Sequence, residues 1–149
     1  LEEDRVVVPG DGDNIWHRAY VEDVASAMRI VAESGEPGAA YNVGDRRLVT
    51  IREMLELIAD VADTDVEIVT ASERELSAAG LSTEDFVLFR SHPHILATDR
   101  LASLGWESTP VREAMARSVE AHRDSDRDGS EHDPGPEKRE AVLDVLDTV

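Results

Sequence analysis

The chain has 149 residues, of which 41% are hydrophobic, so it can bury one core, and no apolar run approaches the ~20 residues that span a bilayer. Thirty-three acidic residues against 15 Lys and Arg give a formal net charge of −18, which repels phosphate backbones and anionic membranes and disfavours nucleic acid as a partner. The absence of cysteine excludes a disulfide framework and a thiolate metal site.

The amino-terminal part predicts two extended segments, a helix and a further strand. Leu1 opens the chain without a Met, so we expect it to begin partway through a larger protein; no signal peptide is present, and cytoplasmic residence is expected. The elements follow in order: a strand over 6–8 closed by a Gly-rich turn, an extended segment over 15–20, a helix from Val21 to Gly35 and a strand over 40–43. The apolar residues of that helix fall on one face at helical spacing: Val21, Val24, Ala25, Met28, Val31 and Ala32.

The middle of the chain opens with a strong helix signal. Thr50 and Glu53 form a capping-box signature before an amphipathic helix over 51–62. Further elements follow: a strand over 66–69, a helix over 72–79, a turn capped by Ser82, a brief helix capped by Thr98 and ended by Gly105, and a last domain helix from Pro110 with Thr109 as its cap.

The carboxy-terminal part changes composition. Residues 1–122 are expected to form one α/β lobe, whereas 123–136 are rich in Asp, Gly and Pro and predict an acidic disordered linker. Residues 137–149 predict a short helix that is marginal alone and needs a surface to dock on. Lys138 is the only lysine, and dense acid with scarce lysine indicates a halophilic, haloarchaeal protein; an acidic mesophilic protein is the alternative.

The connection before the first helix carries the first candidate binding residues, which are Trp16, His17, Arg18 and Tyr20. An indole, an imidazole and a guanidinium in one connection suit a flat or anionic ligand, because Arg forks onto phosphate or carboxylate. The alternative is a surface loop whose Arg pairs with one of the many acids. Asp23, at the start of the helix, favours a cap or first-turn role over a catalytic one.

A second polar concentration lies at residues 90–94, where Arg90 and His92 are candidate substrate-binding residues. His92 and His94 flank Pro93, and in an extended segment both would point to one face. A metal site would need a third ligand, and neither Asp99 nor Glu84 is more than a guess, so no metal is expected. A solvated loop is the simplest alternative.

No catalytic or cofactor motif is complete. Gly10 and Gly12 follow a strand, but Asp11 and Asp13 would face a pyrophosphate, and Ile15 stands where the third glycine of a dinucleotide loop is required. Neither tyrosine has a Lys four residues on, and no Cys nucleophile exists. We therefore assign no catalytic and no cofactor-binding residue.

Three segments in order resemble the extended short-chain dehydrogenase/reductase family of NAD-dependent epimerases and dehydratases. They are Tyr20-Val21-Glu22-Asp23-Val24-Ala25, then Tyr41-Asn42-Val43-Gly44 with the capped helix behind it, and Asp99 to Trp106 before the last helix. The order matches over residues 5–120. Within the family the chain is most similar to atypical members, including the chloroplast stem-loop RNA-binding proteins, through Phe89-Arg90 and Leu104 to Ser108.

The resemblance implies a split fold, with a Rossmann domain for NAD or NADP and a smaller C-terminal α/β lobe that closes over a sugar-nucleotide or related small substrate. This chain corresponds to the smaller lobe, without a complete Rossmann domain and not catalytically complete alone. Sugar-nucleotide epimerases place an Arg at the position of Trp16 to hold the diphosphate, and Arg18 is offset from it. The expected partner is the missing Rossmann portion or another subunit, with a homodimer as a further candidate. The alternative is a non-catalytic RNA- or protein-binding module.

Overall fold

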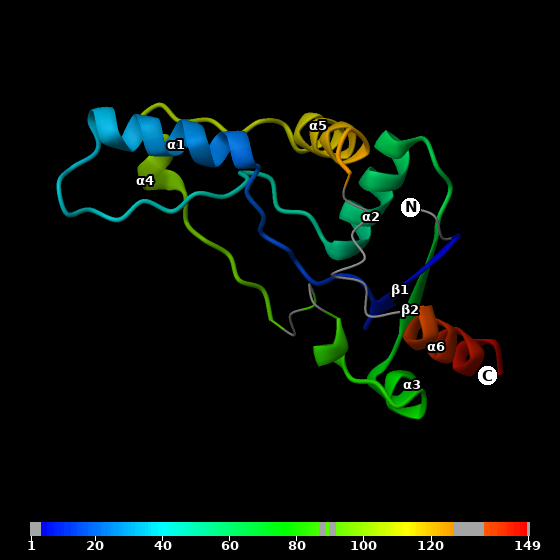
Figure 1. Cartoon of the computed structure of the whole chain (residues 1–149). Helices are drawn as coiled ribbons and strands as arrows, with labels where there is room; N and C mark the ends of the chain where they lie inside the picture. Colours follow the sequence, from blue (N-terminus) through cyan, green and yellow to red (C-terminus); the bar gives the residue numbers. More distant parts are fainter. Residues whose placement is uncertain (1–3, 87–88, 90–91, 127–135, 149) are drawn as a thin grey trace.

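The computed structural model describes residues 4–86, 89, 92–126 and 136–148. Its elements in chain order are β1 (Arg5–Pro9), α1 (Val21–Ser34), α2 (Ile51–Ala62), β2 (Glu67–Ala71), α3 (Glu73–Ala78), the 3₁₀ turn η1 (Thr83–Asp85), α4 (Asp99–Ala102), α5 (Val111–Arg123) and α6 (Pro136–Thr148). Figure 1 shows α1 and α4 at one end, α2 and α5 in the middle, and the strands with α3 and α6 at the other end. None of the helices in the described part combines the length and the apolar composition that crossing a membrane requires.

The strands form a small parallel sheet, so the chain is a small α/β protein. Strand β1 pairs with β2 in a register that places Val7 beside Val69, with α1 and α2 in the connection between them. The extended segment expected over 15–20 contributes only one bridge, between Ile15 and Thr50. Residues 40–43 were expected to form a strand, and this expectation is wrong for the structure as described: they join no sheet. A strand needs a hydrogen-bonding neighbour, and no strand pairs with residues 40–43 in the part of the chain that the structure describes.

Helix α6 covers the sheet together with α3. Val142 of α6 is fully buried against Ala71 and Leu76. The sheet and α3 thus supply the surface against which this short helix packs, and a helix of this length is marginally stable without one. The Lys138 ammonium donates to Asp85 at 2.8 Å, and this contact is the main reason why the pKa of Asp85 falls to about 2.

The middle core joins α2 to α5 through Met54, Val111 and Met115. The capping box expected at Thr50 is confirmed: its hydroxyl accepts from the Glu53 N–H at 3.1 Å, and the Glu53 carboxylate accepts from the Thr50 N–H at 2.9 Å. Because these bonds join residues three positions apart, the helix start depends little on the rest of the fold.

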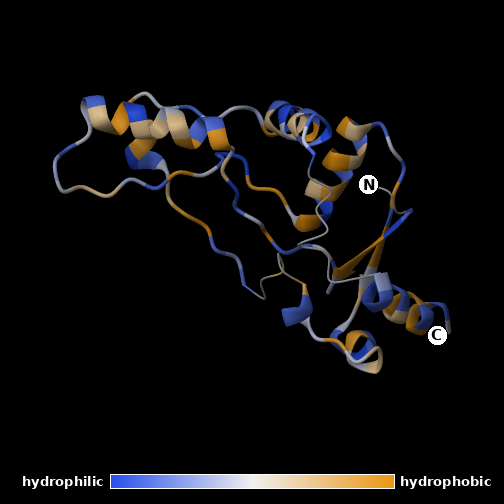
Figure 2. Ribbon diagram, viewed as in Figure 1, coloured by the Kyte–Doolittle hydropathy of each residue, from blue (hydrophilic) through white to orange (hydrophobic). Residues whose placement is uncertain are grey.

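The third core lies under α1, and the face of the helix that it buries is mostly not the one that the apolar spacing predicts. Its inner face packs Ala27 against Leu101 and Trp106, with Ile30 and Val31 at the margin. Most of the apolar face marked by the helical spacing points outward instead: Val21 is 72% and Met28 69% exposed, and Ala25 and Ala32 are also exposed. Figure 2 shows hydrophobic residues along α1, away from the sheet. An apolar helix face ordinarily lies against a core, so this one lacks a partner among the described residues.

Two expected caps are absent. Thr98 makes no side-chain cap bond to α4, although Gly105 adopts the expected left-handed conformation with φ of +87°. Helix α5 has Pro110, not Thr109, at its cap position. The Thr109 hydroxyl is used elsewhere, as the following contacts show.

Candidate functional site

The candidate residues before α1 lie on a segment that runs antiparallel to residues 45–50. The Trp16 N–H donates to the Val49 carbonyl at 3.1 Å, and the Asp45 N–H donates to the Arg18 carbonyl at 2.8 Å. The Trp16 side chain is half-buried against the core between α2 and α5. Its indole therefore serves packing in this structure and is only partly available to a ligand.

His17 joins two loops. Its Nδ1 accepts from the Leu96 N–H at 3.0 Å, which leaves the ring proton on Nε2, and Nε2 lies 2.9 Å from the Asp45 carbonyl. A methyl group on Gly44 would overlap the imidazole, so glycine is required where the ring crosses the chain. Both ring nitrogens are therefore occupied in holding residues 44–45 beside residue 96.

Arg18 and Asp45 form a buried ion pair. The Arg18 Nε lies 2.7 Å from Asp45 Oδ2, and the two side chains are 14% and 2% exposed. The contact between Arg18 Nε and Asp45 Oδ2 does not have the geometry of a hydrogen bond. The Arg18 Nη2 and Asp45 Oδ1 atoms are also buried without a hydrogen-bond partner among the residues that the structure describes. Burial raises the pKa of Asp45 above its ordinary value, and the charge of Arg18 opposes that rise. Of the two alternatives for Arg18, the structure thus shows pairing with an acid.

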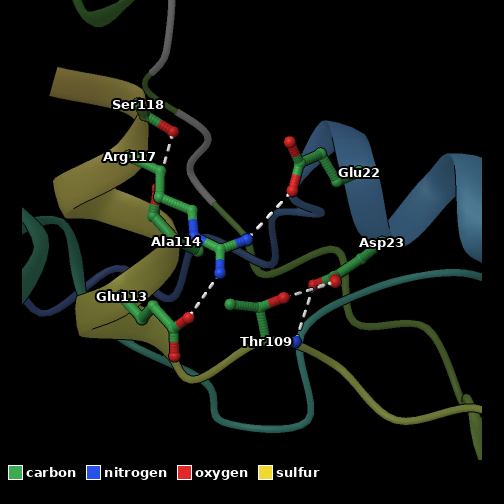
Figure 3. A network of polar contacts seen from close by, with 7 residues as sticks. All are labelled: Glu22, Asp23, Thr109, Glu113, Ala114, Arg117 and Ser118. Atoms are coloured by element: carbon green, nitrogen blue, oxygen red, sulfur yellow. Dashed lines mark hydrogen bonds and ion pairs between the residues drawn. The ribbon is translucent and has the colours of Figure 1, made fainter. Parts of the chain in front are cut away.

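Asp23 links α1 to the segment before α5 through hydrogen bonds. Its carboxylate accepts from the Thr109 N–H at 2.9 Å and from the Thr109 hydroxyl at 2.7 Å (Figure 3). Its carbonyl accepts from Trp106 Nε1 at 3.1 Å. The residue lies in the first turn of α1, as expected, but its side chain holds a distant segment and caps no helix.

Tyr20 is buried next to Arg117, the centre of the charged cluster in Figure 3. The Arg117 guanidinium lies between Glu22, at 3.0 Å, and Glu113, at 2.6 Å. Contact with the Tyr20 hydroxyl, followed by these carboxylates, raises the pKa of Arg117. Tyr20 is therefore sequestered by a salt-bridge network and does not face solvent.

The second concentration of candidates lies at the surface. His92 and His94 are exposed, with stacked rings whose centroids are 4.9 Å apart. Arg90 lies outside the described residues. Within the described part of the chain no group of His, Asp or Glu is arranged to hold a metal ion. Because His17 binds the backbone of Leu96, this loop lies next to the junction at Asp45.

The structure therefore brings His17 and Arg18 together with Asp45 and the 92–96 loop. It places the side chains of Trp16 and Tyr20, which come before and after this pair in the chain, in packed positions. The sequence analysis did not single out Asp45, and it assigned Thr109 to a capping role. The one available signal was a carboxylate directly after Gly44 at the end of an expected strand. We take the junction of residues 17–18, 44–47 and 92–96 as the candidate site.

The loop after β1 does not fit a dinucleotide. Gly12 is buried under the Arg52 side chain, whose Nη2 donates to the Asp11 carbonyl at 3.0 Å. Asp11 and Asp13 are exposed carboxylates that would repel a pyrophosphate, and no helix starts at this turn. No step of NAD or NADP chemistry can be assigned to these residues.

Asp23→Ala is expected to lower the free energy of unfolding by about 2–3 kcal/mol, because two donors of Thr109 lose a charged acceptor in a partly buried place. Urea unfolding followed by circular dichroism measures this loss. The matched control is Glu22→Ala, which removes an exposed ion pair worth less than about 1 kcal/mol. Equal effects of the two substitutions would contradict the assigned role of Asp23.

Comparisons with known proteins give the family. Residues 1–44 match the model of the NAD dependent epimerase/dehydratase family. GDP-6-deoxy-D-mannose reductase of Pseudomonas aeruginosa is 34% identical over 120 residues, which cover 76% of this chain and 39% of the reductase. A trifunctional UDP-glucose 4,6-dehydratase, epimerase and reductase of Arabidopsis thaliana, RHM1, is 27% identical over 114 residues, covering 76% of this chain and 15% of that protein.

Solved structures agree with the sequence matches. The structure of RMD from Pseudomonas aeruginosa complexed with NADPH aligns with a TM-score of 0.57 and 27% identity, over 82% of this chain and 37% of that one. A Thermus thermophilus UDP-glucose 4-epimerase complexed with NAD aligns with a TM-score of 0.59 and 25% identity, over 81% and 35%. The chain thus spans less than half the length of the relatives it matches. The chain belongs to the NAD-dependent epimerase/dehydratase family, the extended short-chain dehydrogenase/reductases.

Proposed function

We propose that this chain is the C-terminal, substrate-side part of an NAD(P)-dependent epimerase, dehydratase or reductase that acts on a nucleoside diphosphate sugar. The observation that carries the proposal is the alignment of 82% of the chain with only 37% of a reductase that holds NADPH. The part of such a protein that this chain lacks is then the part that would hold the dinucleotide.

The substrate class rests on the relatives and on the polar junction. The relatives are named for GDP-, UDP- and dTDP-linked sugars. In this chain Arg18 is committed to Asp45, so it is not placed to hold a diphosphate. The exposed side chains beside the junction include Arg46 and Arg47, which follow Asp45, and the imidazole of His94. These groups would contact the anionic part of the substrate.

Titration of the ¹⁵N-labelled chain tests the assignment by NMR. We expect no saturable shifts with NADPH or NAD up to about 1 mM, because the Gly-rich loop that cradles a pyrophosphate is missing. UDP-glucose is expected to shift the amides of residues 44–47 and 92–96, whereas glucose and inorganic phosphate serve as controls. NAD(P)H binding tighter than about 100 µM would refute the substrate-side assignment. If UDP-glucose and a GDP-linked sugar both leave the spectrum unchanged, the substrate class is wrong.

A non-catalytic RNA-binding module is the competing function. The net charge of −18 opposes it, because contacts to phosphates need clusters of Lys and Arg. Retention of a stem-loop RNA in a low-salt filter assay, together with indifference to nucleoside diphosphate sugars, would replace the proposed function with this one.

A further inference from the structure

Helix α6 is fastened to the rest of the chain at three levels along its length. Near its start the Lys138 ammonium donates to the Asp85 carboxylate of η1 at 2.8 Å. In its middle Val142 is fully buried beside the sheet and α3. Near its end Asp147 accepts two hydrogen bonds, each of 3.2 Å, from the Arg5 guanidinium of β1. Because a helix of 13 residues is marginal without such contacts, α6 is an element with a docked and an undocked state.

The η1 turn is closed by the same carboxylate that Lys138 holds. Asp85 Oδ2 accepts from the Ser82 N–H at 2.9 Å, and Oδ1 accepts from the Lys138 ammonium. The next residue, Phe86, packs against the apolar cluster that contains Val142 of α6. An ion pair and an apolar contact with α6 therefore hold two successive residues of the chain, Asp85 and Phe86.

Phe86 leads directly to the loop that belongs to the candidate site. Residues 87–91 separate it from the 92–96 loop, and so short a connection limits how far the loop can lie from Phe86. At its other end the loop is held by the Leu96 N–H, which donates to His17 Nδ1 at 3.0 Å. Release of Phe86 and Asp85 from α6 would give the loop conformational freedom that substrate binding must remove again.

We propose that α6 positions the 92–96 loop of the candidate site, with Lys138 as the positioning residue that acts through Asp85. Under the proposed function, on which the inference rests, docking of α6 then controls the affinity for the nucleoside diphosphate sugar. The ion pair is half-exposed, with side chains that are 42% and 30% exposed. A pair at the surface contributes little to global stability, so a change in the loop after its removal reports positioning and not unfolding.

Substitutions in the ¹⁵N-labelled chain test the coupling by NMR. Lys138→Met is expected to shift the amide signals of Phe89 and of the 92–96 loop, and to raise the Kd for UDP-glucose by about threefold or more. Lys138→Arg keeps the charge and should leave both close to those of the unsubstituted chain. Arg29→Met is the matched control, because it also removes one cation from a surface ion pair, with Glu33 at 3.6 Å, and should change neither.

A chemical comparison keeps the test decisive if Lys138→Met does not fold. Lys138 is the only lysine, so acetylation of the folded chain removes its charge selectively, whereas reductive methylation keeps it. We expect the loop amides to shift on acetylation and not on methylation. Acetylated Lys138→Arg, in which the amino terminus is the remaining amine, should show no shift.

Unchanged loop amides after loss of the Lys138 charge would overturn the proposal, as would shifts of the same size in Arg29→Met or in Lys138→Arg. The outcome is separable from the proposed function. If the loop shifts as expected but UDP-glucose binds to no form of the chain, α6 positions the loop and the proposed substrate class is wrong. If UDP-glucose binds equally well to Lys138→Met and to the unsubstituted chain, the proposed function stands and its control by α6 is refuted.

Discussion

Arg18→Met is expected to lower the free energy of unfolding at neutral pH by about 3–5 kcal/mol, because it leaves the Asp45 carboxylate buried without a counter-charge. The carboxylate is only 2% exposed, and Arg18 is the cation that touches it. Equilibrium urea unfolding measures the loss. Replacing both partners, in Arg18→Met with Asp45→Leu, is expected to recover most of it, since no charge then stays buried. A double variant as unstable as the single one would contradict the ion-pair account.

The same variant has a distinctive pH dependence. Burial already raises the folded-state pKa of Asp45, and removing Arg18 removes the main opposing charge, so the pKa rises further. A raised folded-state pKa gives a contribution that is fully present below the unfolded value of about 3.9 and is lost as the pH rises through the folded value. The deficit of Arg18→Met should therefore shrink on acidification. A deficit that is the same at about pH 4 and pH 8 would show that the charge of Asp45 is not its cause.

Trp106→Ala is the second large expected effect, with a loss of about 3–5 kcal/mol. Trp106 is 1% exposed among Ala27 and Leu101, and its Nε1 donates to the Asp23 carbonyl and to the Ser26 hydroxyl, each at 3.1 Å. Thermal unfolding measures the loss. The matched control is Trp16→Ala, which truncates a half-buried indole and should cost less. An equal effect at both positions would contradict the assignment of Trp106 as the centre of the α1 core.

The Trp106 indole ties the segment before α5 to the first turns of α1. A few contacts thus determine how much free energy of unfolding a substitution near α1 is expected to cost. They are the contacts of the Trp106 indole, the Asp23–Thr109 bonds and the core under Ala27.

Several elements followed from the sequence because their contacts are local. The capping box of α2 joins Thr50 to Glu53, the left-handed residue after α4 is Gly105, and α1 begins where the apolar spacing begins. Each depends on residues within about four positions of one another, which a sequence pattern records directly. The family resemblance also came from ordered local motifs.

The partners of the candidate-site residues could not be predicted from such local patterns. Trp16, His17 and Arg18 are adjacent in the chain, and the sequence leaves two alternatives for them, a ligand-binding group and a surface loop whose Arg pairs with an acid. In the structure the Trp16 indole packs against a core, and the His17 imidazole bonds to the backbone of two loops. The Arg18 guanidinium pairs with the carboxylate of Asp45. No local rule ranks Asp45 above the other 32 acids as the partner of Arg18.

The sequence by itself determined where α1 and α2 begin, the excess of acid, the missing dinucleotide motif and the family. Only the tertiary structure decided that Asp23 binds Thr109 and that Arg18 is paired. It also decided that residues 40–43 lack a neighbouring strand among the described residues and that α1 exposes the face its spacing marks as apolar. The physical reason is that caps and turns are closed by near neighbours. Burial and strand pairing depend instead on which distant surface is present, and at the α1 end of this chain that surface is absent from the described residues.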